Sequence, residues 1–154
     1  MTFFTDKLLI SLITAFIASV AFAIIFQTNK RHLLKVGIAG LITYFVFYTV
    51  KFFFSSLFLA AFLSTLIAAL YGEISARISH APTLIFIVAG LIPTVPGGDS
   101  YYTMKYFIVG DLTNALKYLT NTIATAIGIA GGIVCCSIIF GIINDKLRRK
   151  KSKS

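Results

Sequence analysis

An apolar stretch near the middle of the chain is interrupted in a way that an undisturbed membrane helix does not tolerate. Two prolines, two glycines and a carboxylate follow one another within residues 91–103: Pro93, Pro96, Gly97, Gly98 and Asp99. Proline removes a backbone donor and clashes with the preceding turn, and glycine adopts dihedral angles closed to other residues. Backbone groups freed in lipid must find partners in protein or in a water-lined cavity. We therefore predict that this break lines something polar.

The composition places the chain among polytopic membrane proteins. Of its 154 residues 58% are hydrophobic and only 12% are charged, and the mean hydropathy is +0.92. A soluble domain of this size carries about twice that share of charge. The net charge of +9 does not indicate nucleic acid, because the basic residues are divided between a short loop and the C-terminal end. We predict an all-α, polytopic integral membrane protein with a single transmembrane domain over residues 1–154.

The apolar runs predict about five membrane spans, at residues 8–26, 33–50, 52–71, 82–109 (broken) and 119–143. The run 82–95 is too short to cross alone, so it is expected to join the segment after the break in one discontinuous helix, broken at Pro93–Gly98. The first run resembles a cleavable signal peptide, but its length favours an uncleaved span. Lys51 is expected to close the second span, and a short amphipathic piece is expected at 110–117.

Basic residues orient the predicted spans, because lysine and arginine accumulate on the cytoplasmic side. They cluster in the first loop, at Lys30, Arg31 and Lys35, and in the tail, at 144–154. Five spans place both clusters in the cytoplasm and the N-terminus outside, whereas four spans would place them on opposite sides. An odd number of spans is also typical of one half of an inverted-repeat transporter. Since the chain shows no internal duplication, the other half is expected to be another polypeptide.

The break supplies most of the candidate substrate-binding residues. The half-helix after Gly98 presents free backbone amides that can hold a carboxylate, and hydroxyl groups follow it. An ionisable group within a span marks an ion or substrate path by default, which makes Asp99 a candidate coupling residue. Equally, Asp99 could be solvated near the outer surface and merely cap the second half-helix. The predicted binding residues at the break are Pro93, Pro96, Gly97, Gly98, Asp99, Ser100, Tyr101 and Thr103.

Three further groups of residues complete the predicted sites. Asn121 and Thr125 share a face of the last span and could either meet the substrate or hydrogen-bond to another helix. Glu73 and Arg77, four residues apart, form either a solvated surface pair or a gate at the cytoplasmic rim. The glycines at 128 and 132 form a Gly-x-x-x-Gly pair, which indicates close helix packing.

The sequence predicts no metal site, no cofactor and no catalytic residues. His32 and His80 have no partner at metal-ligand spacing. The adjacent Cys135 and Cys136 form neither a disulfide framework nor a metal-ligand pattern, so packing is their expected role. The segment 72–77 resembles the start of a lipid-transferase motif, but the aspartates of that motif are missing. The chain is therefore predicted not to be an enzyme.

The sequence around the break resembles the threonine/serine exporter (ThrE-like) family, in particular the small YjjB-like subunit that corresponds to the C-terminal membrane half. Its most specific element is Pro-x-x-Pro-Gly after an apolar run. The resemblance covers the chain from about the third span to the end. It is carried by Ile92-Pro93-Thr94-Val95-Pro96-Gly97, preceded by Arg77 and His80-Ala81-Pro82 and followed by Leu119-Thr120-Asn121 and Thr125.

The resemblance implies a two-component secondary exporter in the bacterial inner membrane. In such a system the small subunit pairs with a larger membrane subunit of the same family, which bears a similar membrane half and a cytoplasmic N-terminal domain. Family substrates include threonine and serine, and in some two-subunit systems succinate, with export dependent on the membrane gradient. Gly98-Asp99 departs from the family pattern, so the role of Asp99 is inferred from this chain alone.

The sequence therefore predicts the small subunit of an exporter for small carboxylate-bearing metabolites. The alternative is an accessory subunit that stabilises a larger transporter without lining its path. Expected partners are the larger subunit, the substrate and membrane lipid, with no nucleic acid, and five spans could also self-associate.

Overall fold

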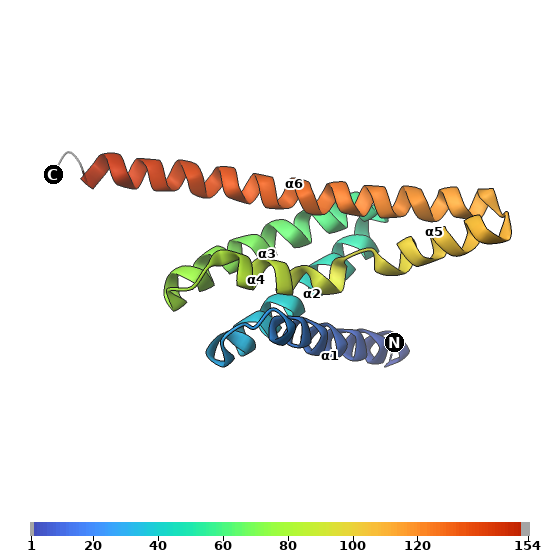
Figure 1. Cartoon of the computed structure of the whole chain (residues 1–154), viewed down its shortest axis with the longest axis horizontal. Helices are drawn as coiled ribbons and strands as arrows, with labels where there is room; N and C mark the ends of the chain where they lie inside the picture. The colour runs from blue at the N-terminus through green and yellow to red at the C-terminus, as the bar shows by residue number, and fades with distance from the viewer. Residues whose placement is uncertain (1, 152–154) are drawn as a thin grey trace.

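The computed structural model describes the backbone of residues 2–151 and the side chains of residues 8–143, and every regular element in it is a helix (Figure 1). The predicted all-α fold is therefore confirmed. The α-helices are α1 Thr2–Ile25, α2 Leu33–Phe54, α3 Leu57–Ser79, α4 Thr83–Leu91, α5 Gly97–Val109 and α6 Leu112–Lys151, with 3₁₀ turns η1 Lys30–His32 and η2 Ile92–Thr94.

Four stretches of the described chain are long and apolar enough to cross a membrane alone: Leu8–Ile25, Lys30–Phe54, Leu57–Ser79 and Leu112–Ile143. A fifth crossing results if Thr83–Thr94 and Gly97–Val109 count as one span, bent by 49°. This bent pair is the discontinuous helix that the prolines and glycines predict. The chain is thus a multi-pass membrane protein of four or five spans.

Small residues let the first four helices approach one another closely. A Cβ at Gly90 in α4 would lie 2.8 Å from the Cβ of Ala39 in α2, and a Cβ at Gly72 in α3 would lie 2.6 Å from Ile87 in α4. Phe86 of α4 is fully buried beside Val36 and Ala76. Helix α4 is therefore held between α2 and α3, and it directs the chain toward the break.

The long helix α6 packs along α3 through the predicted glycine pair. A Cβ at Gly128 would lie 2.7 Å from the carbonyl oxygen of Phe58, and a Cβ at Gly132 would lie 2.8 Å from that of Phe62. Side-chain atoms at these two positions would meet backbone, which cannot move aside easily. Helix association in a membrane depends on such close packing, because lipid is as apolar as the helix surfaces.

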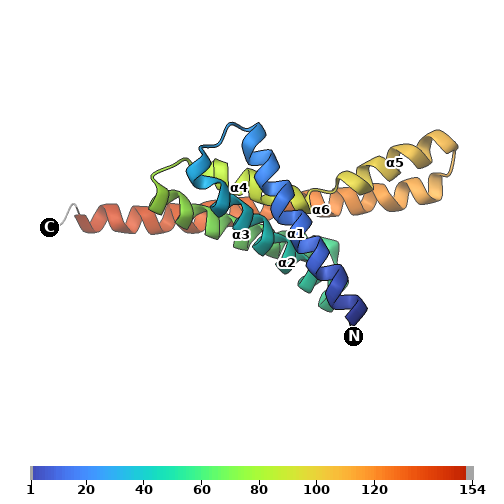
Figure 2. The same ribbon diagram turned by 90° about the horizontal axis from the view of Figure 1, so that it is seen from below.

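Helix α5 and the first part of α6 form a hairpin, here called the arm (residues 97–127), which extends beyond the rest of the bundle (Figures 1 and 2). Helix α6 begins about 16 residues before Gly128, so this part of it reaches roughly 24 Å past the contact with Phe58, at 1.5 Å per residue. Stacked tyrosine rings join the two helices of the arm: the Tyr118 centroid lies 5.2 Å from that of Tyr102 and 5.6 Å from that of Tyr106. No residue of α5 is buried.

Two helix boundaries differ from the sequence prediction. Helix α2 continues past Lys51 to Phe54, because one lysine near the end of a span does not stop a helix whose following residues are phenylalanines. The amphipathic piece expected at 110–117 and the span expected at 119–143 form one continuous helix, α6. Between Leu112 and Ile127 the sequence has no proline or glycine that would separate them.

The glycines of the break also behave differently from the prediction. Gly97 and Gly98 begin α5, and among the described glycines only Gly110 has a positive φ, of 81°. A Cβ at Gly97 or Gly98 would meet nothing within 4 Å. The break therefore comes from the two prolines, and the glycines leave open space beside it.

Asp111 caps α6 at the tip of the arm. Its carboxylate accepts hydrogen bonds from the Asn114 backbone nitrogen at 3.1 Å and from the Asn114 side-chain amide at 2.6 Å. These bonds hold the pKa of Asp111 below its usual value of 3.8, because they favour the charged form. The charge also interacts favourably with the positive end of the helix dipole.

Adding a methyl group at the α3–α6 contact is expected to destabilise the fold. Gly132→Ala places a Cβ against the Phe62 carbonyl and should cost about 1–3 kcal/mol, as overpacking typically does. The matched control is Gly141→Ala in the same helix, where a Cβ meets nothing within 4 Å. Thermal unfolding in detergent should separate the two variants, and equal melting temperatures would contradict the packing described.

Removing the cap at the tip of the arm is expected to loosen the first turn of α6. In Asp111→Ala the amides of residues 112–115 should exchange hydrogen faster than in the parent at neutral pH. Because the folded pKa is depressed, the capping contribution is present above pH 3.8 and is lost as the pH falls through the lower folded value. Hydrogen exchange by mass spectrometry should show a difference that shrinks on acidification; a constant difference would exclude a role for the charge.

Candidate functional site

A cavity of about 200 Å³ lies where the discontinuous helix breaks. Four separate parts of the chain build it: the end of α2, the first residue of α3, the break with the start of α5, and α6. We call it the break cavity, and it is lined by Phe47, Lys51, Leu57, Pro93, Thr94, Val95, Pro96, Gly98, Asp99 and Thr125.

The local sequence explains the shape of the break. Pro93 lies in the first turn of η2, where its missing N–H costs little, and Val95 is extended, as a residue before proline prefers. The Thr94 hydroxyl donates to the Leu91 carbonyl at 2.8 Å, and the Ser100 hydroxyl donates to the Pro96 carbonyl at 2.8 Å. The Thr94 hydroxyl thus satisfies the Leu91 carbonyl, since the Val95 N–H bonds to Ile92 instead. The Pro96 carbonyl accepts from both the Ser100 hydroxyl and the Ser100 backbone N–H, the latter at 3.0 Å.

The break cavity lies at one end of the helical bundle. Lys51 is three residues before the end of α2, and Leu57 is the first residue of α3. Helices of 22 and 23 residues are about 33–35 Å long, close to the thickness of the hydrocarbon core. The cavity therefore lies toward the end of α2 and α3 that is the outer end in the predicted orientation, and Asp99 in it is partly exposed.

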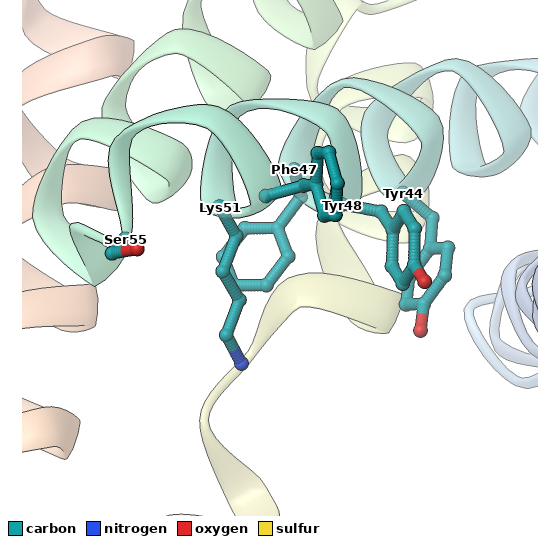
Figure 3. Close-up of a pocket in the computed structure, with 6 residues that line it drawn as sticks. Tyr44, Phe47, Tyr48, Lys51 and Ser55 are labelled. Atoms are coloured by element: carbon teal, nitrogen blue, oxygen red, sulfur yellow. The ribbon is translucent and has the colours of Figure 1, made fainter. Parts of the chain in front are cut away.

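A second, larger cavity adjoins the break cavity along α2. We call it the aromatic cavity; it measures about 430 Å³ and is lined by Tyr44, Phe47, Tyr48, Lys51, Phe52 and Ser55 (Figure 3). Phe47 and Lys51 line both cavities. Figure 3 shows the Lys51 side chain extending from α2 on the side where the break passes.

The structure brings together five of the predicted binding residues. Pro93, Pro96, Gly98, Asp99 and Thr125 all line the break cavity, although Thr125 lies far from the others in the sequence. The Thr125 side chain is buried, and its hydroxyl donates to the Asn121 carbonyl at 2.8 Å. Thr125 reaches the cavity because α6 crosses α3 near Leu57, where the break also lies.

The other predicted binding residues do not line this cavity. Gly97 and Ser100 are exposed at the start of α5, and the Thr103 hydroxyl donates to the Asp99 carbonyl at 2.8 Å. Tyr101 is 65% exposed and packs edge-on against Tyr102. Asn121 lies one turn before Thr125 on α6 and is partly buried. These five residues belong to the arm.

Glu73 and Arg77 lie far from the break. They form an ion pair with 3.9 Å between the Arg77 Nε and the Glu73 Oε2 atoms, and the Arg77 guanidinium also lies over the Phe140 ring at 4.9 Å. Glu73 is 16 residues beyond Leu57 on the same helix, or roughly 24 Å along it. If the pair acts as a gate, it acts at the opposite end of the bundle from the break cavity.

Sequence reasoning missed Lys51 and Thr94 as cavity residues. The sequence interpretation treated Lys51 as the end of a span, so its position inside α2 and its closeness to the break were not predicted. Thr94 lies in the break, and its buried side chain forms part of the cavity lining. The sequence did contain one signal for Lys51. It is a cation about one turn before the end of an apolar helix, and a short turn joins that helix to the next.

Comparison with known families matches residues 11–139 to the family described as Threonine/Serine exporter, ThrE. No curated protein and no solved structure matches the chain.

Among the side chains that the structure describes, no group of three or more histidine, cysteine, aspartate or glutamate residues could hold a metal ion.

The position of the cavity predicts which side of the membrane can reach it. In a variant with Cys135 and Cys136 replaced by alanine, Asp99→Cys should react with a membrane-impermeant maleimide added to intact cells. Ile78→Cys, 68% exposed at the other end of α3, should react only after permeabilisation, and the buried Thr65→Cys should react in neither case. The reverse pattern at positions 99 and 78 would invert the predicted orientation.

Proposed function

The chain belongs to the threonine/serine exporter family ThrE, and from this premise we propose that it is the small subunit of a two-component secondary exporter. The proposed substrates are small carboxylate-bearing metabolites. Threonine and serine are the preferred candidates, and succinate is the next. The family is one of exporters, which agrees with the prediction of a transporter over an enzyme. In this proposal the chain lies in the bacterial inner membrane with its N-terminus outside and its tail in the cytoplasm.

The observation that supports this proposal most strongly is the break cavity. An interrupted membrane helix that lines a cavity is the arrangement that many secondary transporters use for their substrates. The cavity places a cation, a carboxylate and hydroxyl groups from different helices around one space of about 200 Å³. Drug-sized ligands occupy pockets of about 300 Å³ or more, so this volume suits a smaller metabolite.

The surface of the chain supports a membrane-embedded partner. Helix α5 packs mainly against α6 and has no buried residue, and the tip of the arm exposes apolar side chains such as Ile108 at 76% and Val109 at 71%. Leu112 and Leu116 continue this apolar surface on α6. We infer that a larger subunit of the same family covers the arm and closes the open side of the cavity.

Asp99 is the proposed coupling residue. It is an ionisable group beside a cavity in a membrane protein. Of the other described carboxylates, Glu73 pairs with Arg77 at the far end of the bundle and Asp111 caps α6 at the tip of the arm. A carboxylate in this position can exchange a proton or a cation with the outside as the cavity opens. Asp99 would then link export to the membrane gradient.

The experiment that tests this proposal measures efflux from cells preloaded with labelled threonine, serine or succinate. This chain, a candidate large subunit, and both together are compared. Efflux only with both supports a two-component exporter and identifies the substrate. Full efflux from the large subunit alone would contradict the proposal and favour an accessory subunit that stabilises the transporter without lining its path.

Two substitutions in the cavity should reduce efflux without preventing assembly. Asp99→Asn removes a charge, and we expect it to lower the efflux rate about 10-fold or more, the size of one lost charged contact. Pro96→Ala removes a residue that shapes the break, and we expect it to lower the efflux rate as well. Copurification with the large subunit is the control for assembly. Normal efflux in both variants would exclude the break cavity as the transport site.

A further inference from the structure

We propose that Lys51 binds the carboxylate of the transported molecule and that Asp99 binds its ammonium group, so that the break cavity selects a zwitterionic amino acid over a dicarboxylate. This inference rests on the proposed function, and it assigns two recognition residues to the site. No motif in the sequence assigns Lys51 a role.

Lys51 stands beside both cavities at one end of the bundle. It is an exposed residue in the last turn of α2, and its side chain lines both the break cavity and the aromatic cavity. In Figure 3 its amino group extends away from the helix on the side of the break. A lysine ammonium has three donors and no acceptor, so in this cavity it suits a ligand carboxylate.

Asp99 brings the opposite charge to the same cavity from a different element, the first turn of α5. Among the described residues, no ion pair joins the Lys51 ammonium to the Asp99 carboxylate. The two groups line one cavity without forming a direct pair. A small molecule with a carboxylate at one end and an ammonium at the other would complement both charges at once.

The remaining polar groups of the cavity fit a hydroxyl-bearing side chain. The Thr94 and Thr125 hydroxyls each donate to a carbonyl of their own helix, at 2.8 Å in both cases. A hydroxyl has one donor and two acceptor lone pairs, so each oxygen can still accept a hydrogen bond. The methyl groups of these threonines and the side chain of Val95 provide apolar contact beside them.

The same charges disfavour a dicarboxylate. One carboxylate of succinate could pair with Lys51, but the other would then approach Asp99, and like charges at short range repel each other. The geometry therefore predicts a preference for threonine or serine over succinate.

The experiment uses the assembled exporter in vesicles and measures inhibition of labelled serine transport by three unlabelled probes. These are threonine, threonine amide, which lacks the carboxylate, and 3-hydroxybutyrate, which lacks the ammonium group. The exporter without substitutions should prefer threonine over either analogue by about 10-fold to 100-fold, the range of one charged hydrogen bond. Lys51→Gln should lose the preference over threonine amide, and Asp99→Asn should lose the preference over 3-hydroxybutyrate.

Two variants separate recognition from folding and from general charge effects. Lys51→Arg keeps the charge and should keep most of the preference for threonine over its amide. Lys117→Gln, which removes an exposed cation from the arm, is the matched control and should leave both preferences unchanged. A role for Lys51 only in anchoring the helix end would reduce the amount of assembled exporter and leave the selectivity of the remainder intact.

The outcomes distinguish this inference from the proposed function. Transport of threonine with unchanged selectivity in Lys51→Gln would overturn the assignment of Lys51 and leave the exporter proposal standing. Transport of succinate without threonine or serine would overturn the selection of a zwitterion. Absence of transport of all three substrates by the assembled pair would overturn the proposed function and this inference together.

Discussion

The need to satisfy backbone groups in an apolar environment governs this structure. A helix satisfies its own N–H and C=O groups, so the described chain is helical almost throughout. Within the candidate spans it departs from regular α-helix at the 3₁₀ turn η1, which begins the second span, and at the break near Pro93 and Pro96. There the Thr94 hydroxyl donates to the Leu91 carbonyl, which lacks its regular backbone partner, and the Ser100 hydroxyl adds a second bond to the Pro96 carbonyl. The interruption replaces one regular helical turn, and a cavity lined by charged and hydroxyl groups lies beside it.

The rest of the fold holds that cavity in place by close helix contacts. Gly90 lets α4 approach α2, and Gly128 and Gly132 let α6 approach α3 with almost no space for a further atom. Because the α3–α6 contact begins at Phe58, Thr125 is brought to the same level as the break. The scaffold is therefore rigid where it supports the site, whereas the arm beyond it presents a surface that a partner can cover.

The sequence predicted the fold class, the broken helix and five of the cavity residues, since prolines and apolar runs act locally. It did not predict that α6 would be continuous from Leu112. The stretch 113–117 contains polar residues, which suggested a boundary between two elements, but it contains no residue that stops a helix. Nor did it predict that Lys51 would face the break. That contact depends on how α2 and α4 pack, and the spacing of residues along one helix carries no information about it.

Substrate binding in the break cavity can be seen in a cryo-electron microscopy structure of the assembled exporter with bound threonine. We expect density for the amino acid between Lys51 and Asp99, beside Thr94 and Thr125, with the partner covering the open side. Density for threonine at a site lined by other helices, with this cavity filled by lipid or by side chains of the partner, would contradict it.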